Sequence, residues 1–317
     1  MYLTNVIIEK ISAKKVFKGA KIKVMITTMT NISAGYDIID VANPEEAIAD
    51  VENVIAPELI GYPATDIDFI DSLICETSAS NNPNVAMGIS ISIARAASNS
   101  LDIPLFKFLG GALTTDLPIV ASGILVDKND NELIPIVMAE SIEDIVNFYL
   151  KLSKRLVEDY SIVNINGAYT CSDIFNEIPK IRKLIDELKE DEDLDVLLGL
   201  STKKDIVKDK ELSQIDYLEV EEPIEFDGFL CTDIIYEESD FVKVYPYEMG
   251  TITEMYYYIN YIMEKGLYPV IFGNNSSFAH IAVSFKVPFL RSNLSSNVLN
   301  EVWNIERTIV NPNIRRF

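Results

Sequence analysis

Residues 84–111 decide the fold, and they read NVAMGISISIARAASNSLDIPLFKFLGG. Asn82 and Pro83 mark a helix start just before them, because Asn caps free backbone N–H groups and Pro is pre-set for the first helical position. The apolar residues that share one face of the expected helix are Val85, Ile89, Ile93 and Ala96. The stretch therefore predicts a long helix that closes on a Pro-Leu-aromatic segment and a double glycine.

The residues upstream of this helix predict strands followed by helices. Apolar and polar side chains alternate along Lys21–Ile26, as in a strand with one buried face. A second helix start follows at Asn43-Pro44-Glu45-Glu46, where the acids face the positive end of the helix dipole. We therefore expect an α+β domain over residues 1–115.

Downstream, short β-rich runs alternate with helical patterns. Thr251-Ile252-Thr253-Glu254 is a capping box, and Gly266 supplies the stop of the helix that it begins. Pro179 lies inside the apolar-periodic run Ile174–Leu188 and is expected to kink or split that helix. Strand and helix alternate over roughly 200 residues, which predicts the α/β class with a parallel sheet, either a barrel or an open doubly wound sheet.

Composition excludes several classes of partner. The chain has 317 residues and a formal net charge of −22, so it repels the phosphate backbone and is not expected to bind nucleic acid. No apolar run reaches the length of a membrane span, so no membrane partner is expected. The three cysteines, Cys75, Cys171 and Cys231, lack metal or disulfide spacing, and we therefore expect a cytoplasmic protein.

Four segments resemble the enolase family (phosphopyruvate hydratase). They are Val51–Gly61, the stretch 84–111, Glu248–Glu254, and the region from Phe278 to Glu306. The resemblance implies a capping domain over 1–115 and a modified, shortened enolase-type (β/α) TIM barrel over 116–317. Only residues 224–240 separate Pro223 from the next recognisable strand. We therefore expect the barrel to lack one strand-helix unit.

The resemblance also implies the chemistry of enolase, but at most of the family's active-site positions this sequence has residues that do not support it. Enolases dehydrate 2-phosphoglycerate with two Mg²⁺ ions, a lysine base and a glutamate acid. Glu221, in Val220-Glu221-Glu222-Pro223, matches one metal ligand, whereas Gly199 falls at another and the third belongs to the missing strand. One glutamate makes a poor octahedral cage for Mg²⁺. No cofactor is therefore expected, and Mg²⁺ only if activity remains.

The positions of the proton-transfer groups are also altered. Tyr245 stands at the position of the base, and a tyrosine with a pKa near roughly 10 is neutral in the cell. Asn166, in Asn164-Ile165-Asn166-Gly167-Ala168, stands at the position of the acid and cannot exchange a proton. The resemblance implies a further active-site glutamate around residues 133–136.

Two features of a substrate site persist in the resemblance. Ser33, in Ile32-Ser33-Ala34-Gly35, matches a mobile loop serine, and Arg291 replaces the lysine that holds the substrate carboxylate. Arg can grip a carboxylate with two parallel hydrogen bonds. One reading is an anion pocket of Arg291, Ser33 and Glu221. The other is that Arg291 pairs with a neighbouring acid such as Glu221.

The sequence thus predicts an enolase-like pseudoenzyme that has lost hydratase activity and acts by binding, in a regulatory or assembly role. The alternative is a weak or divergent lyase acting on 2-phosphoglycerate or a related anionic carboxylate in glycolysis or gluconeogenesis. Because fold and function separate readily, a retained scaffold does not decide between them. The expected partners are a second copy of the chain, since enolases are typically dimers, and an unidentified protein or small anionic ligand.

Overall fold

The computed structural model describes residues 5–18, 20–160, 162–208 and 210–315. The chain forms two compact units: unit 1 is Met1–Thr114 with Tyr245–Asn260, and unit 2 is Thr115–Val244 with Tyr261–Phe317. The first division lies next to the expected boundary at 115. Residues 245–260, which the sequence analysis places in the second domain, belong to unit 1 instead. Hydrogen bonds hold them there, since the Tyr247 hydroxyl donates to Asp37 Oδ2 at 2.9 Å.

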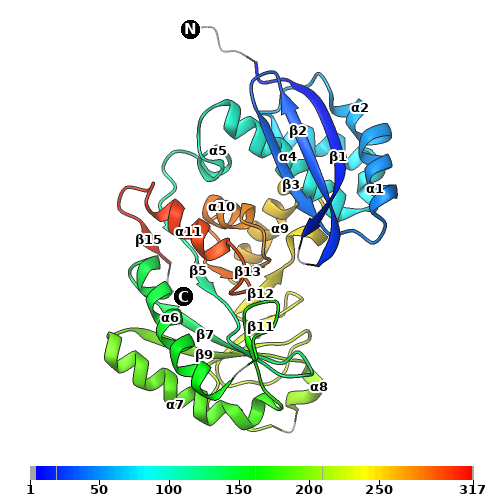
Figure 1. Cartoon of the computed structure of the whole chain (residues 1–317). Coiled ribbons are helices and arrows are strands. Elements are labelled where there is room, and N and C mark those ends of the chain that lie inside the picture. The colour runs from blue at the N-terminus through cyan, green and yellow to red at the C-terminus, as the bar shows by residue number, and fades with distance from the viewer. Residues whose placement is uncertain (1–4, 19, 161, 209, 316–317) are drawn as a thin grey trace. The chain divides into compact units, whose positions relative to one another are not determined.

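Unit 1 contains a three-stranded antiparallel sheet in the order β1-β2-β3 (Figure 1). Its strands are β1 (Ile8–Lys18), β2 (Lys21–Thr30) and β3 (Ala34–Ile39). The predicted alternation in β2 is confirmed, because Val24 and Ile26 are fully buried whereas Met25 between them is only partly buried. This alternation gives the sheet one apolar face that packs in the core of unit 1.

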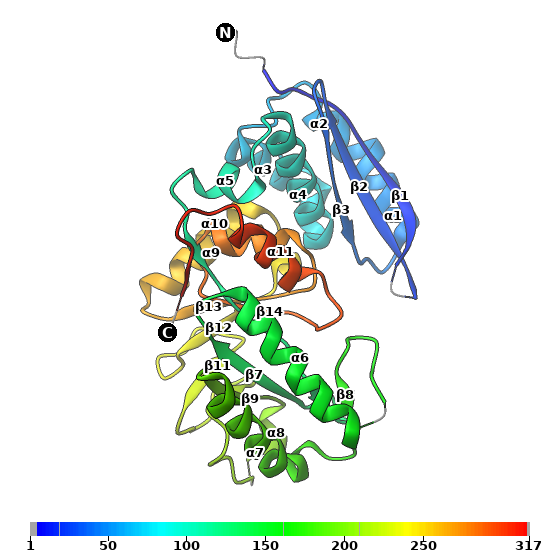
Figure 2. The ribbon, with the colours of Figure 1, turned by 60° about the vertical axis from the view of Figure 1, so that its left-hand side comes forward.

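The helices of unit 1 begin where the sequence places their caps. They are α1 (Pro44–Asp50), the π-helix η1 (Val51–Ile55), α2 (Ala56–Leu59), α3 (Ile67–Glu76), the 3₁₀-helix η2 (Ser78–Asn81), α4 (Pro83–Ser100) and α5 (Leu105–Gly110). The side chains of Asn43 and Asn82 accept from the third residue beyond each, which confirms both predicted starts. The long helix α4 packs against β2 and β3 (Figure 2).

The capping box at Thr251–Glu254 is also confirmed. It follows the 3₁₀-helix η3 (Pro246–Glu248) and begins α9 (Ile252–Glu264). Glu254 Oε2 accepts from the Thr251 N–H at 3.0 Å, and Thr251 Oγ1 accepts from the Glu254 N–H at 3.2 Å. Gly266, with φ +79°, follows the end of α9 in the left-handed conformation that glycine adopts easily.

Unit 2 contains a ten-stranded sheet in the order β5-β14-β13-β12-β11-β10-β9-β7-β6-β8. Its strands are β5 (Ile119–Ala121), β6 (Leu125–Val126), β7 (Glu132–Met138), β8 (Tyr169–Thr170), β9 (Asp195–Ser201), β10 (Tyr217–Glu219), β11 (Phe229–Thr232), β12 (Phe241–Val244), β13 (Tyr268–Phe272) and β14 (Phe289–Arg291). All neighbours from β9 through β14 to β5 are parallel, and β7 is antiparallel to β9. A separate parallel pair joins β4 (Asp116–Leu117) and β15 (Asn313–Ile314).

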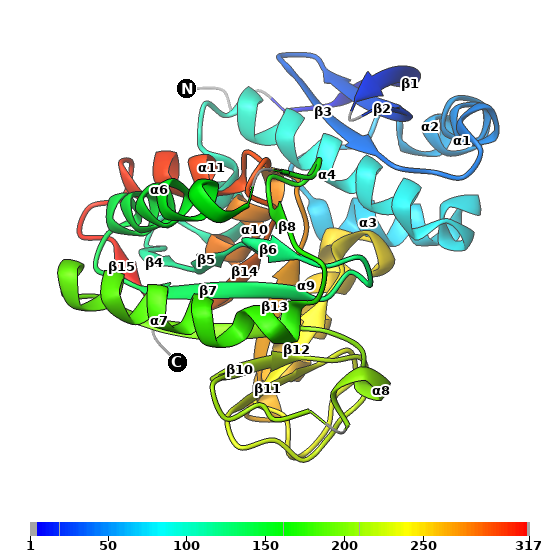
Figure 3. The ribbon, with the colours of Figure 1, turned by 60° about the horizontal axis from the view of Figure 1, so that its bottom comes forward.

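This mostly parallel sheet confirms the α/β class, but it is a curled half-barrel and not a closed barrel. In the described ranges β5 and β7 lie near each other without pairing in the hydrogen-bond ladder. Its helices are α6 (Ile142–Asp159), α7 (Ile174–Glu192), α8 (Lys204–Val207), α10 (Ser277–Ser284) and α11 (Val298–Glu306). Both α6 and α7 pack against β7 (Figure 3). Pro179 lies inside α7 without splitting it.

The segment that was expected to lack a strand-helix unit contains a strand but no helix. β11 (Phe229–Thr232) lies in the segment 224–240, between β10 and β12. The connections on either side of β11, residues 220–228 and 233–240, contain no helix. Parallel neighbours are usually joined by a crossover of about a dozen residues or more. Because these connections are shorter, the sequence spacing does not indicate the strand between them.

No helix in the described ranges combines the length and the apolar character needed to cross a bilayer.

Candidate functional site

The strands of unit 2 bring polar side chains together at one edge of the sheet. The parallel strands from β9 through β14 to β5 end there, and functional side chains in α/β folds gather at the carboxyl ends of such strands. The last residues of β9, β10, β11 and β14 are Ser201, Glu219, Thr232 and Arg291. β7 runs the other way and its first residue, Glu132, pairs with Ser201, so Glu132 reaches the same edge.

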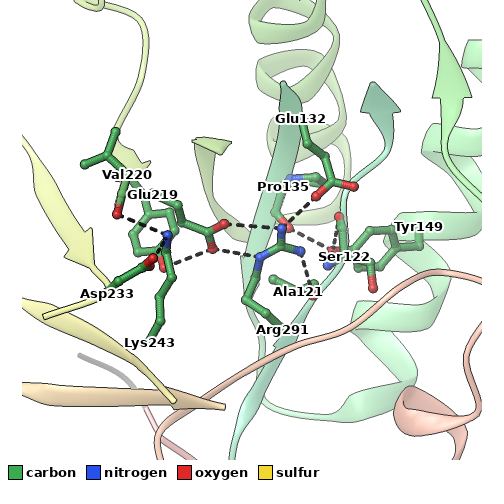
Figure 4. Close-up of polar contacts among 11 residues, drawn as sticks. Ala121, Ser122, Glu132, Pro135, Tyr149, Glu219, Val220, Asp233, Lys243 and Arg291 are labelled. Carbon is green, nitrogen blue, oxygen red and sulfur yellow. Dashed lines mark hydrogen bonds and ion pairs between the residues drawn. The ribbon is translucent and has the colours of Figure 1, made fainter. Parts of the chain in front are cut away.

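Arg291 is the centre of this edge (Figure 4). Its Nε donates to Glu219 Oε1 at 2.7 Å, and its Nη2 donates to Glu132 Oε2 at 2.8 Å. The side chains of Arg291 and Glu219 are 6% and 0% exposed, whereas that of Glu132 is 22% exposed. Burial alone lowers the pKa of Arg291, but the charges of Glu219 and Glu132 outweigh burial and raise that pKa above its ordinary value. The guanidinium is therefore held as a cation between two carboxylates.

Lys243 provides a second buried cation beside Glu219 (Figure 4). Its Nζ donates to the Val220 carbonyl at 3.1 Å and forms an ion pair with Asp233 Oδ1 at 2.7 Å. The side chain of Lys243 is 7% exposed and that of Asp233 is 33% exposed. Burial raises the pKa of the nearby Cys231 thiol above its ordinary value, which keeps the thiol uncharged.

Aromatic side chains complete the surroundings of both cations. Lys243 Nζ and Arg291 Cζ lie 5.8 and 5.6 Å from the ring centre of Phe272. Both cations therefore contact one aromatic ring within the range of a cation–π interaction. The Tyr217 hydroxyl donates to Glu219 Oε1 at 3.1 Å, which adds a second donor to the buried carboxylate.

Tyr149 joins the two strands that do not pair in the ladder. Its hydroxyl accepts from the Ser122 N–H at 2.8 Å and donates to the Pro135 carbonyl at 2.8 Å (Figure 4). Ser122 directly follows β5, and Pro135 lies in β7. A side-chain hydroxyl thus takes the place of ladder hydrogen bonds between β5 and β7, next to the Arg291 cluster.

Glu221 lies outside this cluster. It is exposed, its backbone carbonyl accepts from the Asp233 N–H at 3.3 Å, and its side chain accepts from the Lys204 N–H at 3.4 Å. The acids paired with Arg291 are instead Glu219 and Glu132. β10 ends at Glu219, whose side chain is fully buried, whereas Glu221 lies two residues beyond the end of the strand and is exposed.

The remaining predicted residues lie in three separate segments. Tyr245 begins the segment of unit 1 that follows β12, where its carbonyl accepts from the Glu248 N–H at 2.9 Å. Asn166 is exposed in a loop of unit 2, where its N–H donates to Asn164 Oδ1 at 2.9 Å. Ser33 follows β2 in unit 1, and its N–H donates to Thr30 Oγ1 at 3.0 Å. Their roles, like the substrate-binding role of Arg291, stay predictions.

The side chains at this edge do not fit Mg²⁺. The ion prefers octahedral oxygen ligands with carboxylates among them. Glu219 is paired in the sheet with Ser201 of β9 and Cys231 of β11, neither of which is a carboxylate, and its own carboxylate is bound to Arg291. Among the residues that the structure describes, no three His, Cys, Asp or Glu side chains are grouped to hold a metal ion. The expectation that no cofactor is needed stays a prediction.

Sequence reasoning missed Glu132, Glu219 and Lys243. Glu132 immediately precedes the stretch 133–136, around which the resemblance implies a further glutamate. Lys243 lies two positions before Tyr245 and faces inward from β12 (Figure 4). Strand parity points to Lys243 and Glu219 as well as to Tyr245 and Glu221, because residues two apart along a strand face the same side, and only the ends of the strands choose between them. The strand bounds needed for that argument come only from the structure.

The chain has a near-identical relative among known proteins. The chain is 89% identical over 315 residues to a protein of Methanocaldococcus jannaschii named "Uncharacterized protein MJ0198", and the match covers 99% of this chain and all of that protein. The chain belongs to the family of that protein. No family model matches the chain.

More distant relatives are named enolase. The enolase of Methanosphaera stadtmanae is 23% identical, over 85% of this chain and 86% of that enolase. The enolase of Methanothermobacter thermautotrophicus is 24% identical, over 84% of each. These matches suggest an enolase-like relationship across most of the chain.

Proposed function

We propose that this protein is an enolase-like protein that has lost phosphopyruvate hydratase activity and acts by binding, in a regulatory or assembly role. The observation that supports the proposal is the pairing of the charged groups at the carboxyl edge. Glu219 and Glu132 are bound to Arg291, and Asp233 is bound to Lys243. The acids and cations of this edge therefore already have partners within the chain.

The chemistry of enolase needs charged groups that can act on a substrate. Dehydration of 2-phosphoglycerate removes a weakly acidic proton beside a carboxylate, and the intermediate gains negative charge. Preorganised cations have to stabilise that charge, and each proton-transfer group contributes roughly 10²–10⁴ in rate. Arg291 and Lys243 are neutralised by carboxylates of the chain, so little positive charge is left for a developing anion.

An activity assay tests the loss of catalysis. The purified protein is incubated with 2-phosphoglycerate and excess Mg²⁺, and the enolase of Methanothermobacter thermautotrophicus serves as the positive control. We expect no phosphoenolpyruvate above the blank. A rate of about a thousandth of the control or more, equivalent to a barrier only about 4 kcal/mol higher, would reject the proposal.

A second candidate is a divergent lyase that acts on 2-phosphoglycerate or a related anionic carboxylate. Lys243 favours it, because a buried amine beside the carboxylate of Asp233 at this edge is a group that can move a proton. Thermal shift with phosphorylated three-carbon acids, with and without Mg²⁺, separates the candidates. Stabilisation that requires Mg²⁺, together with turnover that Lys243→Met abolishes, would favour the lyase.

We also propose that the chain self-associates. The proposal rests on the distant enolase relatives and not on an interface in the structure. Sedimentation equilibrium at micromolar concentration tests it. A single species at the monomer mass of 35.6 kDa would reject it.

A further inference from the structure

The two carboxylates on Arg291 are held to different degrees. Glu219 is fully buried, binds Nε and accepts a further hydrogen bond from Tyr217. Glu132 binds Nη2, and its side chain is 22% exposed. Exposing a fully buried charge after its partner is lost is expensive, whereas a carboxylate that already reaches water can turn outward at little cost. Glu132 is therefore the exchangeable partner of Arg291.

The absence of a side chain at Gly123 leaves the space in which the Glu132 side chain lies. A Cβ atom on Gly123 would overlap Cγ, Cδ and Oε1 of Glu132. The side chain of Glu132 thus lies directly over the backbone of residue 123, in space that any other residue would fill. The neighbouring atoms are those of a flexible side chain, so a methyl group at 123 would displace the carboxylate and leave the backbone in place.

The charges of the cluster restrict what could replace Glu132. Two cations, Arg291 and Lys243, face three carboxylates, Glu219, Glu132 and Asp233. A ligand with a single carboxylate on Nη2 would leave this balance unchanged. A phosphate ester or a dicarboxylate would add negative charge where carboxylates already outnumber cations, and such like-charge excess is costly in a partly buried site.

We propose that Glu132 holds the place of a ligand's carboxylate on Arg291, and that this site binds small monocarboxylates. The inference rests on the proposed binding function, for which it names the class of ligand. When the ligand binds, Glu132 turns to water and the ligand's carboxylate accepts the charge-assisted hydrogen bond from Nη2. Glu132 then acts as an internal competitor that lowers the apparent affinity of the empty site.

Binding of propionate to four forms of the full chain tests this inference. Glu132→Gln removes the competing charge, and Gly123→Ala displaces the carboxylate without changing it. Glu143→Gln removes the same charge from an exposed position on α6 and serves as the matched control. The thermal midpoint is followed against propionate concentration at constant ionic strength, which gives Kd for each form.

We expect propionate to bind Glu132→Gln and Gly123→Ala with a Kd at least about fivefold lower than that of the wild type, whereas the control matches the wild type. Two independent variants keep the test decisive if one fails to fold. Equal Kd values in the wild type and both folded variants would overturn the inference, as would tighter binding of 2-phosphoglycerate than of propionate to Glu132→Gln without Mg²⁺. These results do not depend on turnover, so the inference and the proposed loss of activity can fail separately.

Discussion

Replacing Arg291 with methionine is the most direct test of how the cluster is held together. Arg291→Met keeps an unbranched side chain of similar length and removes the guanidinium. Glu219, which is fully buried, then retains only the Tyr217 hydroxyl among the partners named above, at 3.1 Å. Glu132, with 22% exposure, can turn to water. The main penalty therefore comes from one carboxylate, that of Glu219.

The expected loss can be placed within a range. Removing one partner of a buried ion pair costs about 3–5 kcal/mol, because the remaining charge is left without compensation in a poorly solvated place. Arg291 also loses the hydrogen bond to the Ala121 carbonyl, but that contact is long, at 3.4 Å, and adds little. We expect Arg291→Met to lower the free energy of unfolding by about 3–5 kcal/mol at pH 7.

Urea denaturation of three variants measures this effect. Arg291→Met should lower the midpoint without changing the slope. The double variant Glu219→Gln/Arg291→Met should recover more than half of the loss, because it removes the uncompensated charge. Glu132→Gln alone should cost no more than about 1 kcal/mol, since Arg291 keeps its ion pair with Glu219. A loss below about 1 kcal/mol for Arg291→Met, or a double variant no more stable than the single one, would refute the reasoning.

Three further predictions concern other parts of the chain. Burial raises the pKa of Asp71 to about 6 from 3.8, so its charged form opposes folding and the free energy of unfolding falls as pH rises from about 4 to 6. Asp71→Asn should flatten this dependence and add up to roughly 3 kcal/mol of stability at about pH 8. Urea midpoints of both forms at about pH 4 and about pH 8 check this. Tyr149→Phe should cost roughly 1–3 kcal/mol and speed hydrogen exchange at Ser122, whose buried N–H loses its acceptor; unchanged exchange would contradict this. Gly35→Ala should cost more than about 3 kcal/mol, because the new Cβ would meet the backbone of α4. Gly88→Ala should cost less, because its Cβ would meet only the side chains of Ile39 and Ile26. Equal losses of stability in thermal denaturation would count against the packing argument.

Local features of the fold could be predicted because their causes lie within a few residues. The caps at Asn43 and Asn82 and the box at Thr251–Glu254 each depend on hydrogen bonds between residues three apart. The alternation along β2 depends on a period of two. These predictions are confirmed. β11 was missed because four residues between short connections carry too weak a pattern to distinguish a strand from a loop.

The candidate site was only partly predictable. The sequence indicates Arg291 and an acid partner, but the nearest motif suggests Glu221, whereas the structure pairs Arg291 with Glu219. The motif also points to Tyr245, whereas the buried cation beside Asp233 is Lys243, two residues earlier. The exact end of β10 decides which of two nearby glutamates faces the cation, because positions 219 and 221 have the same parity along a strand. A shift of one or two residues, which sequence comparison at low identity tolerates, reverses that choice.

The sequence by itself determined the class of fold and the helix starts, and the family resemblance singled out Arg291 as a cation of interest. Only the tertiary structure decided which groups surround that cation. Glu219 and Glu132 lie 72 and 159 residues from Arg291 along the chain, and the curl of the sheet brings the three together. The residues next to each glutamate in the sequence do not indicate its partner. That partner follows from strand order and register, which are set by packing across the whole unit.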